Sequence, residues 1–369
     1  MQVPVRGRKT IVLSFLLSLG VVATGCSAPT ERTEVIRLAD SYSPKHPFSV
    51  HGTAIFMDAM EQEGLEFEYF PAGQMGNARD LANMVRTNVV DVAPASAAYL
   101  EDQFPLTSVS DLPGTTKNAC VAARALMKLL QPGGVLYEEE YGPRGMRPLW
   151  VNIVPNYEIM TTDKEIRVPA DVEGLLLRSS GGSLDVTTTQ LGAAAVSMPA
   201  SDIYEALTRK TVDGLTFSLL SAASYDLGTV AKHSTEGLNL GAVGIPFVIS
   251  EEKWQQFSPE VQEKLLAAGN DANESLCQNV VNSRDEFKGS LEEGGMTFHP
   301  LTPEETAQWD ELLTDIKTTW AESLDDAGKP GTEVLEAYVV GNVHGPTEIR
   351  VGDRLAQLHE RGTGDERAG

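Results

Sequence analysis

Arg178 is the residue whose type and position best suit the binding of a small ligand. It follows a short apolar run, residues 175–177, that is bounded on both sides by glycines. Such a run predicts a buried strand. In open α/β sheets, ligands bind beyond the carboxyl ends of strands, where a guanidinium can hold a carboxylate through two parallel hydrogen bonds. We predict that Arg178 anchors a carboxylate; the alternative is a structural ion pair with Glu173 or Asp202.

Residues arranged for catalysis or metal binding are scarce. The chain has no G-x-S-x-G, H-E-x-x-H, C-x-x-C, Walker A or G-x-G-x-x-G pattern. Among its six histidines, His46 and His51 are the only close pair, and they span a loop and a helix start. We therefore predict no metal site and no cofactor, although a triad assembled from distant residues stays open.

The first part of the chain alternates between predicted strands and predicted helices. The strands are residues 34–39, 65–70 and 89–93. This alternation predicts a parallel sheet with right-handed crossovers. Tyr42 follows the first strand, and Ser96 and Tyr99 follow the third. We predict that these three side chains line a ligand pocket, with ordinary packing at the strand ends as the alternative.

The second part of the chain continues the α/β pattern. Ser183 is predicted to cap a helix that begins at residue 184. Residues 148–154 and 239–249 are predicted strands that cross between two halves of the protein. A later helix begins with a capping box formed by Thr302 and Glu305.

The N-terminus has the features of an export signal. Within residues 1–25, three basic side chains precede an apolar segment, residues 11–23, that is too short to span a bilayer as a stable helix. Residues 23–26 read Ala-Thr-Gly-Cys and resemble a bacterial lipobox, whose cysteine is lipidated after cleavage. We predict that Cys26 anchors the mature chain outside the cytoplasm through a polar tether, residues 26–33. The alternative is an ordinary signal peptide.

The composition is strongly acidic. The formal net charge is −23, and it becomes −26 without the three basic residues of the export signal. Nucleic acid is therefore a poor partner for this chain. Its 369 residues, 41% of them apolar, are enough to bury a large core in two lobes.

Four ordered motifs resemble a family of transport proteins. They are D-V-E-G-L-L-L-R at residues 171–178, G-A-A-A-V-S-M-P at 192–199, Y-E-A-L at 204–207 and V-D-G at 212–214. In order and spacing they resemble the solute-binding proteins of TRAP (tripartite ATP-independent periplasmic) transporters. The resemblance extends over residues 34–340.

This resemblance implies a two-lobed periplasmic-binding-protein fold of the α/β class, with crossing strands and a long helix that spans the lobes. The expected boundaries are 34–153 and 244–285 for lobe I, 154–243 and 286–345 for lobe II, and 346–369 for a C-terminal tail. The resemblance also implies a protein that is not an enzyme, captures a small organic acid and delivers it to TRAP permease subunits in the membrane. The alternatives are a lipoprotein hydrolase and a ligand-sensing module for a membrane receptor.

Two departures from the family pattern bear on the ligand. Phe217 stands where the family often has an asparagine that hydrogen-bonds the ligand, and Glu158 stands near the position of a second pocket arginine in the sialic-acid-type members. We therefore expect a less polar pocket that favours carboxylates with aryl, branched or alkyl bodies. The alternative is that Phe217 points into the core, since a register change of one residue turns a strand side chain to the other face.

Two cysteines remain after Cys26. Cys120 and Cys277 both fall in helix-like segments. An oxidising compartment would permit them to pair, but their separation in space does not follow from the sequence. We predict two buried free thiols.

Overall fold

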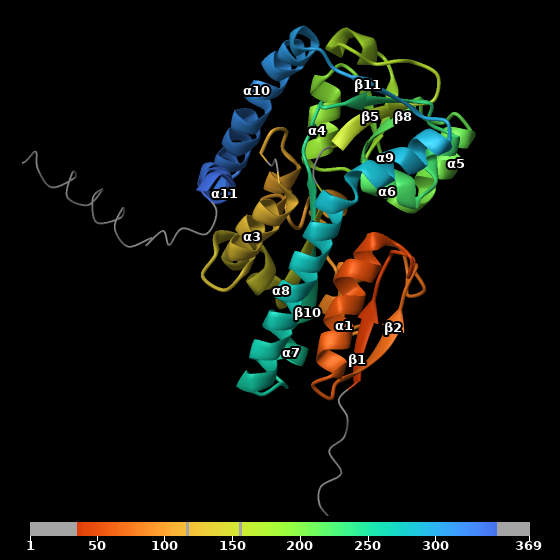
Figure 1. Ribbon diagram of the computed structural model, residues 1–369. Coiled ribbons are helices and arrows are strands. Elements are labelled where there is room, and N and C mark those ends of the chain that lie inside the picture. Colours follow the sequence, from red (N-terminus) through yellow and green to blue (C-terminus); the bar gives the residue numbers. More distant parts are fainter. Residues whose placement is uncertain (1–34, 116–117, 155–156, 345–369) are drawn as a thin grey trace, which may run out of the picture. The chain divides into compact units, whose positions relative to one another are not determined.

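The computed structural model describes residues 35–115, 118–154 and 157–344, so Cys26, the predicted export signal, the tether and the predicted tail lie outside the described residues. The described chain holds two β-sheets with helices packed around them (Figure 1). This confirms the predicted α/β class. No helix among the described residues is both long and apolar enough to cross a membrane.

The first sheet has five strands in the order β2-β1-β3-β10-β4. They are β1 (Val35–Ala39), β2 (Glu66–Phe70), β3 (Val92–Pro94), β4 (Met146–Val154) and β10 (Val243–Ser250). The first three run parallel to one another, as predicted. However, β3 begins three residues later than predicted, because Asn88 adopts a left-handed turn (φ +55°) and the carboxylate of Asp91 accepts hydrogen bonds from Arg37 before the strand starts.

The second sheet has six strands in the order β11-β9-β5-β8-β6-β7. They are β5 (Tyr157–Thr161), β6 (Leu176–Ser179), β7 (Ala194–Ser197), β8 (Gly214–Ser218), β9 (His233–Glu236) and β11 (Thr297–Pro300). β6 is the strand predicted to carry Arg178, and it pairs in parallel with both β7 and β8.

The first sheet forms the centre of lobe I and the second sheet the centre of lobe II. Three segments connect the two lobes. β4 of the first sheet precedes β5 of the second, and β9 precedes β10, which returns to the first. The third connection is the predicted long helix, here two helices joined at Ser283. They are α8 (Pro259–Asn282), which packs against β4, and α9 (Arg284–Glu293), which packs on the lobe II side (Figure 1).

The remaining helices cover the two sheets. They are α1 (Ala54–Glu61), α2 (Leu81–Arg86), α3 (Ala119–Leu130), α4 (Ser183–Gln190), α5 (Ile203–Thr208), α6 (Leu219–Ser224), α7 (Glu251–Trp254), α10 (Pro303–Asp326) and α11 (Gly331–His344). The capping box of Thr302 and Glu305 starts α10 as predicted. Because α10 contacts α4 and leads into α11, which packs on α3, the C-terminal helices also join the two lobes.

Ser183 does not cap α4. The helix begins at Ser183 itself, and Gly182 occupies the position before it. The Ser183 hydroxyl instead donates to Ser108 Oγ of lobe I at 2.8 Å. The predicted cap is wrong because the start of α4 lies against the other lobe, which supplies a partner for that hydroxyl.

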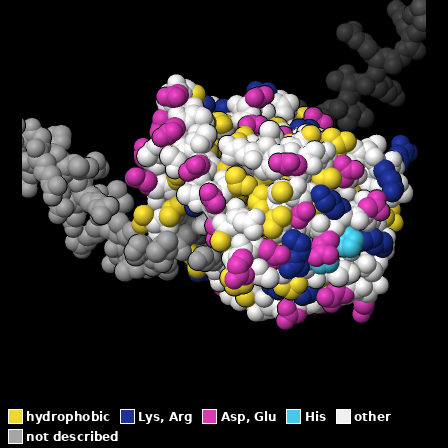
Figure 2. Space-filling view, turned by 90° about the horizontal axis from the view of Figure 1, so that it is seen from above, with side chains coloured by type: hydrophobic (Ala, Val, Ile, Leu, Met, Phe, Trp, Pro, Cys, Tyr) yellow, Lys and Arg dark blue, Asp and Glu magenta, His cyan; other side chains and the backbone are white. Residues whose placement is uncertain are grey.

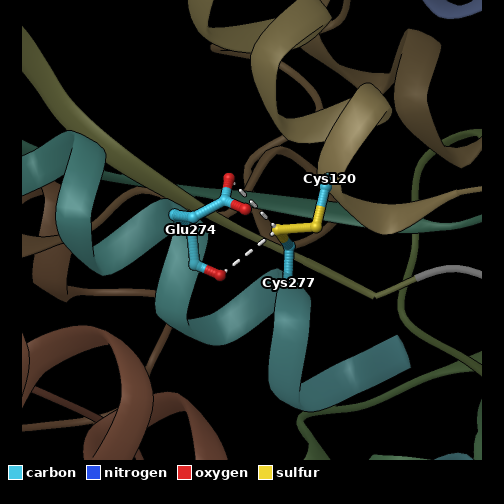
Figure 3. Close-up of side chains that lie close together, drawn as sticks. All are labelled: Cys120, Glu274 and Cys277. Carbon is cyan, nitrogen blue, oxygen red and sulfur yellow. Dashed lines mark hydrogen bonds between the residues drawn. A yellow bond between two sulfur atoms is a disulfide. The ribbon is translucent and has the colours of Figure 1, made fainter. Parts of the chain in front are cut away.

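Cys120 and Cys277 form a disulfide, so the prediction of two free thiols is wrong (Figure 3). Cys120 lies in the first turn of α3 and Cys277 in α8, and their Cα atoms are 4.9 Å apart. The two helices pack side by side, which brings together residues 157 positions apart in the sequence. Glu274 lies one turn before Cys277 (Figure 3). Since both helices belong to lobe I, the disulfide leaves the lobes free to move relative to each other.

Candidate functional site

A small cavity lies between the two lobes. Its volume is about 20 Å³, which is room for about one water molecule. Aromatic and aliphatic side chains form most of its wall, and three serines add hydroxyl groups. The lining residues are Tyr42, Phe48, Ser96, Tyr99, Val154, Val243 and Ile245 from lobe I, and Tyr157, Ser180, Ala200, Phe217, Ser221 and Tyr225 from lobe II. An organic acid therefore enters only if side chains or whole lobes move apart.

The lobes touch directly beside this cavity. Gly181 of lobe II has a φ of +107°, and a Cβ atom built on it would stand 2.2 Å from the carbonyl oxygen of Ala98 in lobe I. The backbone N–H of Ala200 in lobe II donates to the hydroxyl of Tyr99 in lobe I at 3.2 Å. Glycine at position 181 thus permits the close approach of the two lobes.

Arg178 is completely buried and only partly hydrogen-bonded. Its Nε and Nη2 atoms both donate to the carbonyl oxygen of Met198, at 3.0 and 2.7 Å. Nη1 has no partner among the described residues. The Met198 carbonyl thus occupies the side edge of the guanidinium, and the end edge, formed by Nη1 and Nη2, is available for a planar carboxylate. Within the described chain, Arg178 forms no ion pair with Glu173 or Asp202.

Phe217 on β8 contacts Arg178 and lines the cavity, whereas Arg178 itself is not among the lining residues. The Cζ atom of Arg178 is 5.0 Å from the centre of the Phe217 ring, which is a cation–π contact. The same ring lines the cavity and meets Tyr157 edge-on at 6.0 Å. The register of β8 therefore turns Phe217 toward the cavity and not into the core behind the sheet.

The structure also places the other three predicted site residues in the cavity wall. Tyr42 and Ser96 are buried there, and Tyr99 lies beside them. Arg79 sits over the Tyr99 ring at 5.6 Å and donates to Ser197 Oγ of lobe II at 3.1 Å. These positions satisfy the geometry for a pocket wall, and their role in binding stays a prediction.

Sequence reasoning missed several lining residues, above all two tyrosines of lobe II. Tyr157 begins β5, and Tyr225 follows α6 directly. Burial raises the pKa of both hydroxyls and of Tyr42, so all three stay protonated and can donate hydrogen bonds. Ser180 could have been predicted as a lining residue, because it directly follows β6, the strand that carries Arg178.

Glu158 faces away from the cavity, although its neighbour Tyr157 lines it. Its carboxylate accepts hydrogen bonds from the Thr235 hydroxyl and from the backbone N–H groups of Gly237 and Leu238. Burial raises the pKa of Glu158 to about 7. Glu158, which stands near the expected position of a second pocket arginine, thus holds the segment between β9 and β10 in place through these hydrogen bonds.

One face of the protein carries many charged side chains, unlike the wall of the cavity (Figure 2). Figure 2 shows Asp and Glu side chains spread over one face of the protein, with Lys and Arg side chains among them. The formal net charge of the chain, −23, supports solubility. The positive charge of Arg178, in contrast, is buried beneath an aromatic ring.

The comparison with protein families agrees with this geometry. Residues 42–323 match the family described as bacterial extracellular solute-binding protein, family 7. The chain belongs to this family. It is therefore an extracytoplasmic solute-binding protein. Solved TRAP solute-binding proteins share its fold.

Individual relatives are distant but cover most of the chain. The C4-dicarboxylate-binding periplasmic protein DctP of Rhodobacter capsulatus is 25% identical over 326 residues, which cover 85% of this chain and 94% of the relative. A TRAP solute-binding protein from Rhodoferax ferrireducens, solved with copurified benzoate, superposes with a TM-score of 0.76 at 20% identity over 84% of this chain and 98% of its own. One from a Sulfitobacter species, solved with β-D-galacturonate, has a TM-score of 0.72 at 19% identity, over 83% and 100%. These likenesses confirm the two-lobed fold.

Proposed function

We propose that this protein captures a small carboxylate with an apolar or aromatic body between its two lobes and passes it to a TRAP permease. The single observation that carries the proposal is the state of Arg178. This buried guanidinium has its side edge held by a backbone carbonyl, and its Nη1 atom has no partner among the described residues. A buried cation is stable only when an anion or hydrogen-bond acceptors satisfy it, and a ligand carboxylate supplies both.

The wall of the cavity supports an apolar body for this acid. Three aromatic rings, those of Phe217, Tyr157 and Tyr225, stand on the lobe II side. Hydroxyl groups of a sugar acid would be buried against such rings, and each one left unpaired would cost about 1–3 kcal/mol. An aryl or alkyl body gains free energy by its burial instead.

Isothermal titration of the ligand-stripped protein with a panel of acids tests the proposal. Aryl, branched and keto acids should bind, and sugar acids should bind at least tenfold more weakly. Arg178→Ala should lower the affinity by a factor of about 30 to several thousand, because removing one member of a buried charge pair costs about 2–5 kcal/mol. Unchanged affinity in a folded Arg178→Ala protein would refute the anchoring role, and preference for sugar acids would refute the apolar body.

A hydrolase is the competing function. The three cavity serines, Ser96, Ser180 and Ser221, are the hydroxyl groups that could act as nucleophiles, and none of them is hydrogen-bonded to a histidine among the interactions of the described residues. Incubating the protein with a bound ester of the same acid separates the two functions. A binding protein returns the ester unchanged, whereas a hydrolase releases the acid with turnover.

The lipid anchor is the second part of the proposal and rests on Cys26, which lies outside the described residues. A small residue before a cysteine at the end of an export signal supports it. Expressed in a bacterium that processes lipoproteins, the wild type should sediment with membranes, and Cys26→Ser should be released into the soluble fraction. Equal partitioning of both proteins would contradict the anchor while leaving the ligand proposal intact.

A further inference from the structure

His46 carries a buried hydrogen-bond donor that has no partner in the described part of the protein. Its side chain is buried, and its Nδ1 atom accepts a hydrogen bond from the backbone N–H of Phe48 at 3.1 Å. Because Nδ1 uses its lone pair in this way, the neutral ring carries its proton on Nε2. Nε2 is completely shielded and unpaired. Buried donors in proteins are nearly always satisfied, so this one calls for a partner that binds to the protein.

His46 is connected to the ligand cavity through a series of touching rings. Arg178 lies over Phe217 at 5.0 Å, Phe217 is 6.4 Å from Tyr225, and Tyr225 is 5.7 Å from His46. Phe217 and Tyr225 both line the cavity, as does Tyr42, whose ring is 4.7 Å from His46. His46 therefore lies just behind the cavity wall, at the other end of this series from the guanidinium.

The cavity must enlarge before it can hold an acid, because its present volume is about 20 Å³. Tyr225 belongs to lobe II, and Tyr42 and His46 belong to lobe I. Separation of the lobes thus parts Tyr225 from the loop that carries Tyr42 and His46. This removes one of the aromatic rings that shield the imidazole.

We propose that His46 Nε2 donates a hydrogen bond to a second, uncharged acceptor on the bound acid. The preferred ligands are then carboxylates that carry a hydroxyl or keto oxygen at the end remote from the carboxylate. This inference rests on the proposed function, in which the carboxylate binds to Arg178. Such a ligand touches lobe II through Arg178 and lobe I through His46, so it stabilises the closed arrangement more than a plain acid does.

The surroundings of His46 favour an uncharged acceptor over a second carboxylate. Burial lowers the pKa of His46 to about 3, so the imidazole stays neutral and offers no positive charge. The buried carboxyl of Asp40, whose pKa is raised by burial to about 6, is ionised at neutral pH and contributes to the raised pKa of Tyr42 and of Tyr225. A second carboxylate would meet this negative field without a counter-charge.

The test compares matched acids on matched proteins. Isothermal titration would use the plain acids benzoate and pentanoate, their uncharged-acceptor partners 3-hydroxybenzoate, 4-hydroxybenzoate and 4-oxopentanoate, and the dicarboxylates isophthalate and glutarate. In the wild type, at least one hydroxy or keto acid should bind about tenfold or more tightly than its plain partner. Isophthalate should bind more weakly than 3-hydroxybenzoate, and glutarate more weakly than 4-oxopentanoate.

Two variants of His46 identify the residue responsible. His46→Leu removes the donor and should reduce the gain from the acceptor to about twofold or less, while plain acids keep similar affinity. His46→Gln offers an amide N–H in place of Nε2–H and should restore part of the gain. Because the comparison is between two ligands on one protein, a general loss of stability affects both and cancels.

The outcomes separate this inference from the proposed function. If no acid binds the wild type, the proposed function is wrong. If plain acids bind but no hydroxy or keto acid gains affinity, or if the gain persists in His46→Leu, the role of His46 is wrong and the proposed function stands. Tighter binding of the dicarboxylates would refute the preference for an uncharged acceptor.

Discussion

Replacing Gly181 by alanine tests whether the contact between the lobes is required for tight binding. A Cβ atom on residue 181 would stand 2.2 Å from the Ala98 carbonyl oxygen. Ordinary contacts between a carbon and an oxygen are at least about 1 Å longer, so the lobes must separate by about that distance at this point. The obstacle is the backbone of Ala98, which has no rotamer that could move it aside.

The cost of this separation follows from the hydrogen bonds that it breaks. They are Ser183 Oγ to Ser108 Oγ at 2.8 Å, Ala200 N–H to the Tyr99 hydroxyl at 3.2 Å, and Arg79 Nη2 to Ser197 Oγ at 3.1 Å. At about 0.5–1.5 kcal/mol each, losing the three destabilises the closed form by roughly 2–4 kcal/mol. Since a tenfold change in affinity is about 1.4 kcal/mol, the Kd should rise by a factor of roughly 30 to 1,000.

Gly174→Ala is the matched control. Gly174 also has a positive φ, +76°, but a Cβ atom there would meet nothing within 4 Å. Both variants should lose a similar free energy of unfolding through backbone strain, and only Gly181→Ala should lose affinity in isothermal titration. Small-angle scattering with saturating ligand should show a larger radius of gyration for Gly181→Ala. Wild-type affinity in Gly181→Ala, or an equal loss in Gly174→Ala, would refute the reasoning.

Two further perturbations probe stability and release. Replacing Cys120 and Cys277 together by alanine removes the disulfide and should lower the free energy of unfolding by about 2–5 kcal/mol. The Kd for the ligand should stay unchanged, because the disulfide lies within lobe I. A change in Kd above about threefold would contradict this placement. Arg79→Ala should speed ligand dissociation by about two- to fivefold in stopped-flow measurements, because the hydrogen bond to Ser197 is exposed and contributes little free energy to the closed form. An unchanged rate would show that this hydrogen bond does not hold the lobes together.

Much of the fold was predictable because it is encoded in local patterns. The short apolar run bounded by glycines predicted the strand β6 to within one or two residues, and the capping box of Thr302 and Glu305 predicted the start of α10. The same run predicted that Arg178 stands near the end of this strand, where the structure buries it. These features depend on residues close in sequence, which pattern reasoning can follow.

The rest of the site depends on distances that the sequence does not contain. Tyr157 and Tyr225 line one cavity and His46 packs against Tyr225, although the three residues come from separate segments that only the folded chain brings together. The direction of Phe217 depends on the register of β8, which a shift of one residue would reverse. Likewise, Cys120 and Cys277 pair because α3 and α8 are adjacent, a tertiary fact that no spacing in the chain reveals.

The register between β6 and β7 explains why two of the four sequence motifs act as a unit. Residues 171–178 end at Arg178 on β6, and residues 192–199 include β7, which pairs with β6 so that Arg178 lies opposite Val196. Two residues further along, the carbonyl of Met198 reaches the side edge of the guanidinium. An insertion of one residue between the motifs could be absorbed in the turn after α4, but a shift of the pairing by one residue would replace Met198 by its neighbour. The carbonyl would then point away, because successive residues of a strand face opposite directions. Arg178 would then lose its contact with the Met198 carbonyl. The carboxylate anchor that we propose therefore depends on the pairing of the two strands and not on the arginine alone.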